Sequence, residues 1–480
     1  MARAAEWQSA MAAATAFAFP NSTGIFSTLG GSNTLGACDT AGKLRCNQTA
    51  FSRLTFDSLQ SLHAVDNWVN GGIGAMGPEL AAACTQKFAP DGTRMATIEY
   101  LPNLGYTNDD VRELAAIERL LHYLQRRGAR VAFVNILPGK AMPRLVHCRD
   151  GQIGCTTRNH IERLDKALKQ LAEKYYVPTV TMDRDGADGA SIFNDDFMHL
   201  NQKGHEAVRD ELIRLYREWP HWQKALDTSM HDADATRAAN LMPLVCHMGD
   251  ELQPLIGASH GFRRVNFARD QWSRADKIGY QATTAGSSLT LCTGFPPEPP
   301  SKDLPLPQWA KLGPTVNQST KEGLRHVIAV GMQISHDLNL PLFGVAKLSC
   351  AGACKCVCRW SHHGAFNESC LFDGLAKGRA TVTAFLRLLA SRESPPPAAA
   401  PALGAGEGGG GKRLHPERAC AHDQCALTIS NSADPNDRLR VILRSLMVGY
   451  NQHHSSKWLN TYYLDGVGLT DYRRKRRERR

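Results

Sequence analysis

The sequence feature that most restricts the possible folds is an alternation of short apolar runs with amphipathic stretches across the first 220 residues. The amphipathic stretches 109–127 and 159–175 repeat leucine or isoleucine at helical spacing, and Gly128 follows the first of them. Strands that alternate with such helices predict a parallel α/β sheet covered on both faces. Ligands of these folds bind at the carboxyl ends of the strands. The apolar runs of strand length are Gly24–Leu29, Ala64–Val69, Met95–Leu101, Val131–Leu137 and Val177–Met182.

The pattern changes after Trp222, where short β-like runs recur without long helices between them. Pro- and Gly-rich loops separate these runs, which predicts a β-sandwich or jelly roll. A chain of 480 residues is long enough for two domains. We therefore expect an α/β domain at 1–222, a β-rich sandwich-like domain at 232–470 and a basic, disordered tail at 471–480. The expected β runs are 241–246, 264–267, 278–283, 288–292, 326–330, 342–348, 381–389, 426–429 and 439–448.

The net charge of +10 is concentrated in that tail. Residues 473–480 hold seven basic side chains and one acidic side chain, so they contribute +6 and leave only +4 for the rest of the chain. This remainder is too small to indicate a nucleic-acid-binding body. The tail is typical of a solvated segment, with binding to a membrane surface or a polyanion as the alternative. No apolar run reaches the ~18 residues of a membrane-spanning helix, so we expect no transmembrane segment.

The cysteines and glycosylation sequons together favour the secretory pathway or an extracellular location. Fourteen cysteines are many for a cytosolic enzyme, and six form close pairs that suit small disulfide-closed loops: Cys38 with Cys46, Cys148 with Cys155, and Cys420 with Cys425. Four sequons mark the glycosylation candidates Asn21, Asn47, Asn317 and Asn367. The apolar stretch Ala10–Phe19 is short and poorly flanked for a signal peptide. We expect it to pack as a helix, and we expect the natural start to lie upstream of Met1.

A second group of cysteines, at positions 350, 354, 356, 358 and 370, raises the question of a zinc site. The alternating Cys-x-Cys-x-Cys spacing does not match the Cys-x2-Cys pairs of common zinc-binding loops. Disulfides within the β-rich domain are the favoured interpretation, given the other signs of an oxidising compartment. We expect no metal site and no cofactor.

Two segments far apart in the sequence carry the residue types of a serine nucleophile and its base. Ser32 follows the first predicted strand among glycines, where its side chain can stand at the carboxyl edge of the sheet. Asp196 precedes His199 by three residues, in a predicted loop before a helix. A carboxylate at this spacing can hold one imidazole nitrogen while the other accepts a hydroxyl proton. Each segment alone also fits a structural turn, so the hypothesis rests on their combination.

Two further segments offer donors for an oxyanion. Gly72 lies in a glycine cluster after the second predicted strand, where a backbone N–H can approach a reacting oxygen. Asn103 follows the third predicted strand, where its amide could donate to the same oxygen. A tight turn and a loop asparagine bonded to its own backbone are the structural alternatives. The order Ser, Gly, Asn, Asp-x-x-His at successive strand ends is more specific than any one of these segments.

This order resembles the four signature blocks of the SGNH, or GDSL-like, hydrolase family. The resemblance covers roughly residues 24–218, and its most specific part is Asp-Phe-Met-His-Leu-Asn-Gln-Lys-Gly-His at 196–205. More narrowly, the segments 29–34 and 69–72 resemble a group of plant and algal SGNH proteins with C-terminal β domains.

The resemblance implies a flavodoxin-like parallel sheet and a role for each matched residue. Ser32 would be the nucleophile, His199 the base and Asp196 the carboxylate that orients it. The Ser32 N–H, the Gly72 N–H and the Asn103 amide would form the oxyanion hole.

The sequence departs from the family pattern in two blocks. The family's Gly-Asp-Ser reads Gly-Gly-Ser at 30–32, which is compatible with the triad because Asp196 supplies the carboxylate. The asparagine block usually reads Asn-Asp, but Asn103 is followed by leucine, whereas Asn108 is followed by aspartate. We assign the block to Asn103 because it lies four residues after Glu99, and Asn108 is better placed to cap a helix.

The family resemblance implies a serine ester hydrolase that forms an acyl-enzyme on acyl or acetyl esters of carbohydrate or lipid, such as an acylated polysaccharide or glycan. An O-acyltransferase with the same triad is the first alternative. A non-catalytic glycan-binding or wall-associated protein with a degenerate hydrolase domain is the second. The missing Gly-Asp-Ser aspartate supports the degenerate domain, and the presence of all four blocks argues against it.

Overall fold

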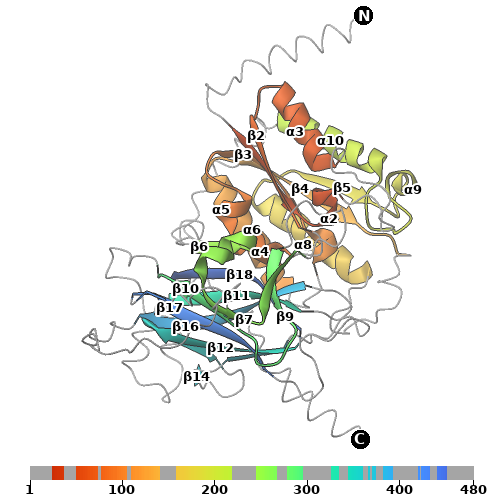
Figure 1. The fold of residues 1–480 in the computed structure, drawn as a ribbon. Coiled ribbons are helices and arrows are strands. Elements are labelled where there is room, and N and C mark those ends of the chain that lie inside the picture. The colour runs from red at the N-terminus through yellow and green to blue at the C-terminus, as the bar shows by residue number, and fades with distance from the viewer. Residues whose placement is uncertain are drawn as a thin grey trace, which may run out of the picture. The chain divides into compact units, whose positions relative to one another are not determined.

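The computed structural model describes residues 24–36, 50–73, 77–104, 110–140, 158–218, 245–266, 278–295, 326–334, 344–359, 366–367, 370–373, 382–392, 420–421, 423–432 and 440–450. The chain divides into two compact units, which are described separately (Figure 1). The first comprises Met1–Pro243 with Ala268–Asp276, and the second comprises Leu244–Phe267 with Lys277–Arg480.

The first unit contains a five-stranded parallel sheet in the order β2-β1-β3-β4-β5. Its strands are β1 (Ile25–Gly30), β2 (Asn67–Gly72), β3 (Thr93–Glu99), β4 (Arg130–Leu137) and β5 (Thr179–Asp183). The chain runs outward from β1 in one direction to β2 and in the other through β3, so β1 and β3 flank a topological switch point. This order confirms the predicted flavodoxin-like parallel sheet.

Helices cover both faces of this sheet (Figure 1). On one face lie α3 (Phe51–Ser61) and α10 (Gln202–Arg217), and the opposite face carries α4 (Pro78–Ala83), α5 (Thr85–Phe88), α6 (Asp110–Arg126) and α8 (Arg158–Lys174). The predicted helices 109–127 and 159–175 match α6 and α8 to within one residue at each end. Gly128 ends α6 because it adopts a φ of +72°, which disfavours residues with a Cβ.

The apolar faces of these helices form the core of the first unit. Side chains of α3 and α10 pack against the sheet around Phe26, which is fully buried. The core residues beside it include Phe51, Phe56, Leu59, Met95, Val134, Ile136, Val180, Val208 and Leu212. Short elements complete the carboxyl edge of the sheet: α2 (Ser32–Leu35), η1 (Leu101–Asn103) and α9 (Gly189–Ile192).

The second unit is built from two antiparallel sheets. The five-stranded sheet has the order β15-β12-β17-β10-β7, and the larger sheet has the order β14-β13-β16-β11-β18-β9-β8, with β6 paired to β18. This architecture confirms the predicted β-rich fold. Its strands are β6 (Val245–Met248), β7 (Ile256–His260), β8 (Phe262–Asn266), β9 (Ile278–Ala282), β10 (Ser288–Thr293), β11 (His326–Ile334), β12 (Val345–Gly352), β13 (Cys354–Arg359), β14 (Phe366–Asn367), β15 (Cys370–Asp373), β16 (Val382–Arg392), β17 (Cys425–Ser432) and β18 (Val441–Tyr450), and η2 (Gly249–Leu255) follows β6.

Disulfides connect the two sheets of this unit. Cys350 of β12 is bonded to Cys356 of β13, and Cys354 of β13 is bonded to Cys425 of β17. The Sγ atoms of Cys350, Cys354 and Cys425 lie within 4.8 Å of one another, as ligands of one metal ion would. Their involvement in disulfides accounts for this clustering, in agreement with the disulfides predicted within the β-rich domain.

The expected pairing of Cys420 with Cys425 is wrong. Cys420 is bonded to Cys292 at the end of β10, and Cys425 to Cys354. The strand register explains the difference: Cys425 opens β17, where Gly352 of β12 is its partner, and this brings it beside Cys354. Cys84, Cys246 and Cys370 are disulfide-bonded as well.

The other two expected cysteine pairs lie outside the described residues. Cys38 and Cys46 fall in the segment 37–49, and Cys148 and Cys155 fall in the segment 141–157. A disulfide between Cys38 and Cys46, and another between Cys148 and Cys155, therefore stay predictions from the sequence.

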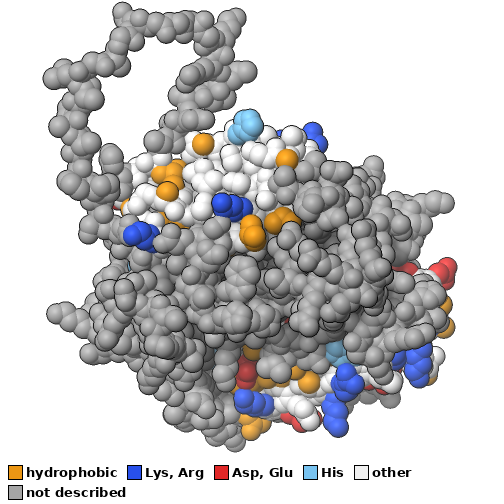
Figure 2. Space-filling view, turned by 90° about the horizontal axis from the view of Figure 1, so that it is seen from below, with side chains coloured by type: hydrophobic (Ala, Val, Ile, Leu, Met, Phe, Trp, Pro, Cys, Tyr) orange, Lys and Arg blue, Asp and Glu red, His pale blue; other side chains and the backbone are white. Residues whose placement is uncertain are grey.

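Several further expectations fall on residues that the structure does not describe. They concern the stretch Ala10–Phe19, the boundary near 222–232, the tail 471–480, and the sequons at Asn21, Asn47 and Asn317. Asn367 lies in β14. Within the described parts of the chain, no helix has the length and apolar character needed to cross a membrane. In the view of Figure 2, the described Lys and Arg side chains occur singly or in small groups, and hydrophobic side chains and white surface lie among them.

Candidate active site

The nucleophile turn, which we define as residues 30–36, begins where β1 ends. Gly30 and Gly31 lead into the four-residue helix α2, whose first residue is Ser32. A Cβ added at Gly31 would lie 2.3 Å from Asn103 Nδ2, and one at Gly30 would lie 2.1 Å from Thr34 Oγ1. The two glycines are therefore required by close packing. They place a partly exposed Ser32 at the carboxyl edge of the sheet.

The expected base His199 and the expected carboxylate Asp196 reach the same edge from the loop before α10. Ser32 Oγ lies 2.7 Å from His199 Nε2, and His199 Nδ1 is hydrogen-bonded to Asp196 Oδ2. Because the ionised carboxylate can only accept, Nδ1 carries the hydrogen and Nε2 is left to accept from the Ser32 hydroxyl. The three side chains thus form a continuous serine–imidazole–carboxylate chain.

The base loop, residues 196–199, is a tight turn stabilised by Asp196 itself. Asp196 Oδ1 accepts from the N–H groups of Met198 (3.0 Å) and His199 (2.9 Å), and Phe197, which lies between Asp196 and Met198, has a φ of +60°. Burial acts to raise the Asp196 pKa, but the bond to the His199 ring, the charge of that ring and the two N–H donors lower it below its usual value. Asp196 is therefore anionic at neutral pH.

Asn33 connects the base loop to the nucleophile turn. Its Oδ1 accepts from Leu200 N–H at 2.9 Å, and its Nδ2 donates to the Met198 carbonyl at 3.4 Å. The side chain is fully buried, and it follows Ser32 directly in the sequence. The two segments that carry the serine and the histidine are consequently held together by one amide.

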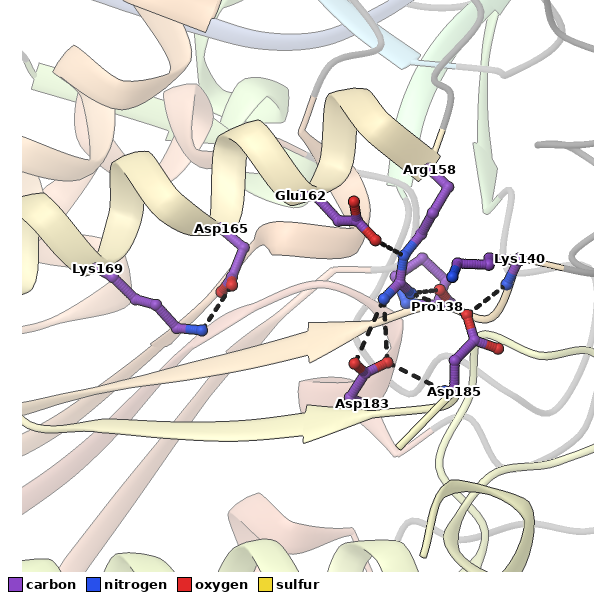
Figure 3. A network of polar contacts seen from close by, with 8 residues as sticks. All are labelled: Pro138, Lys140, Arg158, Glu162, Asp165, Lys169, Asp183 and Asp185. Carbon is purple, nitrogen blue, oxygen red and sulfur yellow. Dashed lines mark hydrogen bonds and ion pairs between the residues drawn. The ribbon is translucent and has the colours of Figure 1, made fainter. Parts of the chain in front are cut away.

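An arginine at the start of α8 organises the other side of the base loop (Figure 3). Arg158 points toward the ends of β4 and β5, where it donates to the Pro138 carbonyl and, at 3.1 Å, to Asp183 Oδ1. The neighbouring Gly139 N–H donates to the Phe197 carbonyl at 2.8 Å. The Arg158 network therefore fixes the strand ends on which the base loop rests.

The two expected oxyanion donors differ in their surroundings. Asn103 ends η1 directly after β3, and its amide lies against Gly31, next to Ser32. Gly72 lies behind α2, because a Cβ there would be 2.5 Å from Leu35 N. Its N–H donates to Asn70 Oδ1 at 2.9 Å. The Gly72 N–H can therefore donate to a substrate oxygen only if that oxygen replaces Asn70 Oδ1 as its acceptor.

His205 has the packing role that the sequence indicated. It is fully buried, its Nδ1 accepts from Phe51 N–H at 3.2 Å, and its ring stacks on the Phe51 ring. Burial, together with the nearby His199, lowers its pKa to about 3, so it stays neutral. His205 thereby satisfies a donor at the start of α3.

Sequence reasoning missed Asn33, Asn70 and Arg158 as parts of the site. Asn33 is one residue from Ser32, and Asn70 is two residues from Gly72. Their positions within these candidate segments could have indicated that they belong to the site. Arg158 offered none, because it follows β4 by some twenty residues and its partners are strand ends that only the fold brings together.

No protein-family model matches the chain, and a comparison with curated proteins found no match. Two solved structures of a two-domain esterase active on acetylated mannans are similar, one of them co-crystallised with mannopentaose. They are 15% and 14% identical to the chain, cover 92% of it and 94% of their own length, and give TM-scores of 0.43 and 0.46. A lipase/acylhydrolase from Enterococcus faecalis is 15% identical, with 41% of this chain and 96% of its own covered and a TM-score of 0.31.

The four blocks named in the sequence meet at one edge of a flavodoxin-like sheet, with the serine, histidine and aspartate in hydrogen-bonded order. The first unit therefore has the fold and the arrangement of site residues that the sequence resemblance implies.

Proposed function

We propose that the protein is a serine ester hydrolase that acts through an acyl-enzyme. The observation that carries the proposal is the chain of hydrogen bonds from Ser32 Oγ through His199 to Asp196, in which the imidazole nitrogen facing the serine is the acceptor. A hydroxyl bonded in this way can be deprotonated as it attacks a carbonyl carbon.

In the first half-reaction, Ser32 Oγ forms a bond to the ester carbonyl carbon while its proton moves to His199 Nε2. The resulting oxyanion accepts hydrogen bonds from the Ser32 N–H and the Asn103 amide, with the Gly72 N–H as a third donor once it releases Asn70. His199 then returns the proton to the departing alkoxide. In the second half, a water molecule attacks the acyl carbon, His199 takes its proton, and Ser32 leaves as a hydroxyl.

The substrate class we propose is acyl or acetyl esters of carbohydrate or lipid, following the family resemblance of residues 24–218. The disulfides between the sheets of the second unit support a place in the secretory pathway or outside the cell. Gel mobility before and after removal of N-linked glycans tests the location, because the sequons are used only in that pathway.

Covalent labelling by a fluorophosphonate probe tests the proposed activity. We expect peptide mapping to find the label on Ser32, and we expect labelling to run in parallel with hydrolysis of short-chain aryl esters. Ser32→Ala should abolish both while leaving the fold intact, since losing a triad nucleophile costs several orders of magnitude in kcat. A Ser32→Ala protein that keeps wild-type rates would show that another residue is the nucleophile. Transfer of the acyl group to a sugar hydroxyl in preference to water would indicate an acyltransferase instead.

A further inference from the structure

A buried carboxylate lies directly beneath the nucleophile turn. Glu99 is the last residue of β3 and only 1% exposed, and its Oε2 accepts three hydrogen bonds from the turn. The donors are Gly31 N–H (3.1 Å), Thr34 N–H (3.3 Å) and the Thr34 hydroxyl (2.9 Å). Two of the three are backbone groups on either side of Ser32.

These bonds replace a cap that the turn lacks. The N-cap residue of α2 is Gly31, which has no side chain and makes no side-chain cap. An N-cap side chain ordinarily accepts from the N–H of the second or third helical residue, and Thr34 is the third residue of α2. Glu99 makes that bond from a neighbouring strand.

The absence of a side chain at Gly31 also leaves room for the Asn103 amide. Because a Cβ at Gly31 would lie 2.3 Å from Asn103 Nδ2, a capping aspartate or serine at this position would displace the Asn103 amide. Gly30 is constrained similarly, since its Cβ would lie 2.8 Å from Glu99 Oε2. The sequence Gly-Gly-Ser thus admits Asn103 and Glu99 together beside the serine.

We propose that Glu99 is the positioning residue of the nucleophile turn, and that its ionised carboxylate is the form that holds the Ser32 N–H in place for the oxyanion. This inference rests on the proposed hydrolase function. It also explains how Gly-Gly-Ser at 30–32 can form the turn without a capping side chain at Gly31, because the capping carboxylate comes from β3.

The carboxyl group of Glu99 changes its charge near neutral pH. Burial raises its pKa to about 7, although the bonds from Thr34 and Gly31 lower it. β1 and α2 bring no charged side chain to it. The titratable groups on the other elements near β3 are Tyr100, which follows Glu99 in the chain, Glu79 on α4, Glu113 and Arg119 on α6, Arg130 on β4, and His199 across the site.

Full activity should then require the ionised form of Glu99. His199 must be neutral to accept from Ser32, and Glu99 must be ionised, because a carboxylate is a stronger acceptor than a carboxylic acid. As pH falls through 7, protonation of Glu99 should lower kcat by about tenfold. In Glu99→Gln an acceptor oxygen remains but cannot titrate, so this part of the pH dependence should be absent. At pH 8 its kcat should be lower by about tenfold with KM little changed, as expected when charge-assisted bonds become neutral ones.

The experiment compares the full-length wild type with Glu99→Gln and Glu99→Ala over pH 5–9. Asp165→Asn is the matched control, because it makes the same change in another carboxylate that is 7% exposed and is bonded to Asn135 and Lys169. The readouts are kcat and KM on an aryl ester, the fluorophosphonate labelling rate of Ser32, and hydrogen exchange of peptides covering residues 30–36. Exchange needs no turnover, and we expect it to be faster in Glu99→Gln than in the wild type and unchanged in Asp165→Asn.

The outcomes separate the two proposals. A wild type that hydrolyses and labels, beside a Glu99→Gln protein with the same pH dependence, rates and exchange, would overturn the role of Glu99 and leave the hydrolase function standing. A wild type that neither labels nor hydrolyses would overturn the hydrolase function. The exchange difference would then still decide whether Glu99 caps the turn. A Glu99→Ala protein that fails to fold does not affect this decision, because it rests on the Gln variant.

Discussion

Asn33 and His199 are coupled through the main chain on both sides of the histidine. The Asn33 side chain accepts from Leu200 N–H at 2.9 Å and donates to the Met198 carbonyl at 3.4 Å. Asn33, which holds the loop of His199, therefore follows Ser32 directly in the sequence. We expect a displacement of Asn33 to change the position of His199 relative to Ser32. We expect the distance of 2.7 Å between Ser32 Oγ and His199 Nε2 to depend on these two hydrogen bonds.

Asn33→Ala should lower kcat by about 10²-fold, the loss expected when catalytic groups are misplaced by about 1 Å. KM should change little, because no substrate contact is removed. Steady-state kinetics on a short-chain aryl ester measures both. Asn135→Ala is the matched control: that asparagine is also buried, but its amide donates to Asp165 on α8 and not to the base loop. Equal kinetic losses in both variants would indicate a general effect of removing a buried amide.

Asp196→Asn should depress turnover at every pH. The hydrogen bonds to Asp196 lower its pKa, despite burial, so the carboxylate is ionised across the whole neutral range and does not itself shape the pH profile. An amide can donate to His199 Nδ1 and so place the hydrogen on Nε2, the nitrogen that must accept; the corresponding change in a serine protease costs about 10⁴-fold in kcat. A pH–rate profile of the variant that matches the wild type would reject Asp196 as the orienting carboxylate.

The stability of the wild type relative to Glu99→Gln should be greatest in acid and should fall as pH rises. Burial raises the folded-state pKa from 4.5 to about 7, so the folded state binds this proton more tightly than the unfolded state does. The stabilisation is complete below pH 4.5 and is lost as pH rises through 7, with a total of about 3 kcal/mol at most. The difference in unfolding midpoint between wild type and Glu99→Gln, measured from pH 4.5 to 8, should therefore decline as pH rises. A constant difference would show that Glu99 keeps an ordinary pKa.

The stabilisation by Glu99 falls as pH rises, whereas the proposed activity increases as pH rises. The ionised Glu99 that the turn requires is the form that costs stability, as is common for charged groups buried at functional sites. A Glu99→Gln variant that gains stability relative to the wild type between pH 4.5 and pH 8, and that loses turnover at pH 8, would support both roles of Glu99.

Non-reducing peptide mapping should recover peptides joined by Cys292–Cys420 and by Cys354–Cys425. A peptide that contains an internal bond between Cys420 and Cys425 would contradict the strand register of β12 and β17. The same digest tests the disulfide predicted between Cys38 and Cys46 and the one predicted between Cys148 and Cys155. Free thiols at these four positions would remove that part of the argument for an oxidising compartment.

The disulfides illustrate what sequence spacing does not determine. Cys420 and Cys425 are five residues apart, which suits a closed loop, but an extended strand carries consecutive residues away from each other at about 3.3 Å per residue. Cys425 lies at the start of β17, so its partner comes from the neighbouring strand turn at Cys354, 71 residues earlier. Periodicity also missed β13, because its sequence CKCVCR has few of the residues typical of strands.

The parallel sheet could be predicted because strands such as β4 are largely apolar and the helices between the strands are strongly amphipathic. β4 is buried along almost its entire length, and α8 has a charged exposed face, so the two periodicities are distinct in the sequence. The site could be predicted only in part. Ser32 and the pair of Asp196 and His199 occur in compact motifs, whereas the contributions of Glu99 and Arg158 depend on which strand ends become neighbours, and that is a property of the fold.

The α/β unit should carry out the hydrolysis without the β-rich unit. All the residues of the candidate site lie between Gly30 and His205, and the parallel sheet with its covering helices is complete at α10. A fragment of residues 1–243 should therefore fold and hydrolyse a small soluble ester, and it should lose activity on a polymeric or surface-bound ester if the β-rich unit places the substrate. Circular dichroism and gel filtration establish folding, and the fragment carrying Ser32→Ala provides the blank rate. An insoluble fragment would point to an apolar face that the second unit normally covers. A soluble, folded fragment that cannot hydrolyse the small ester, beside an active full-length protein, would mean that residues after 243 supply part of the chemistry.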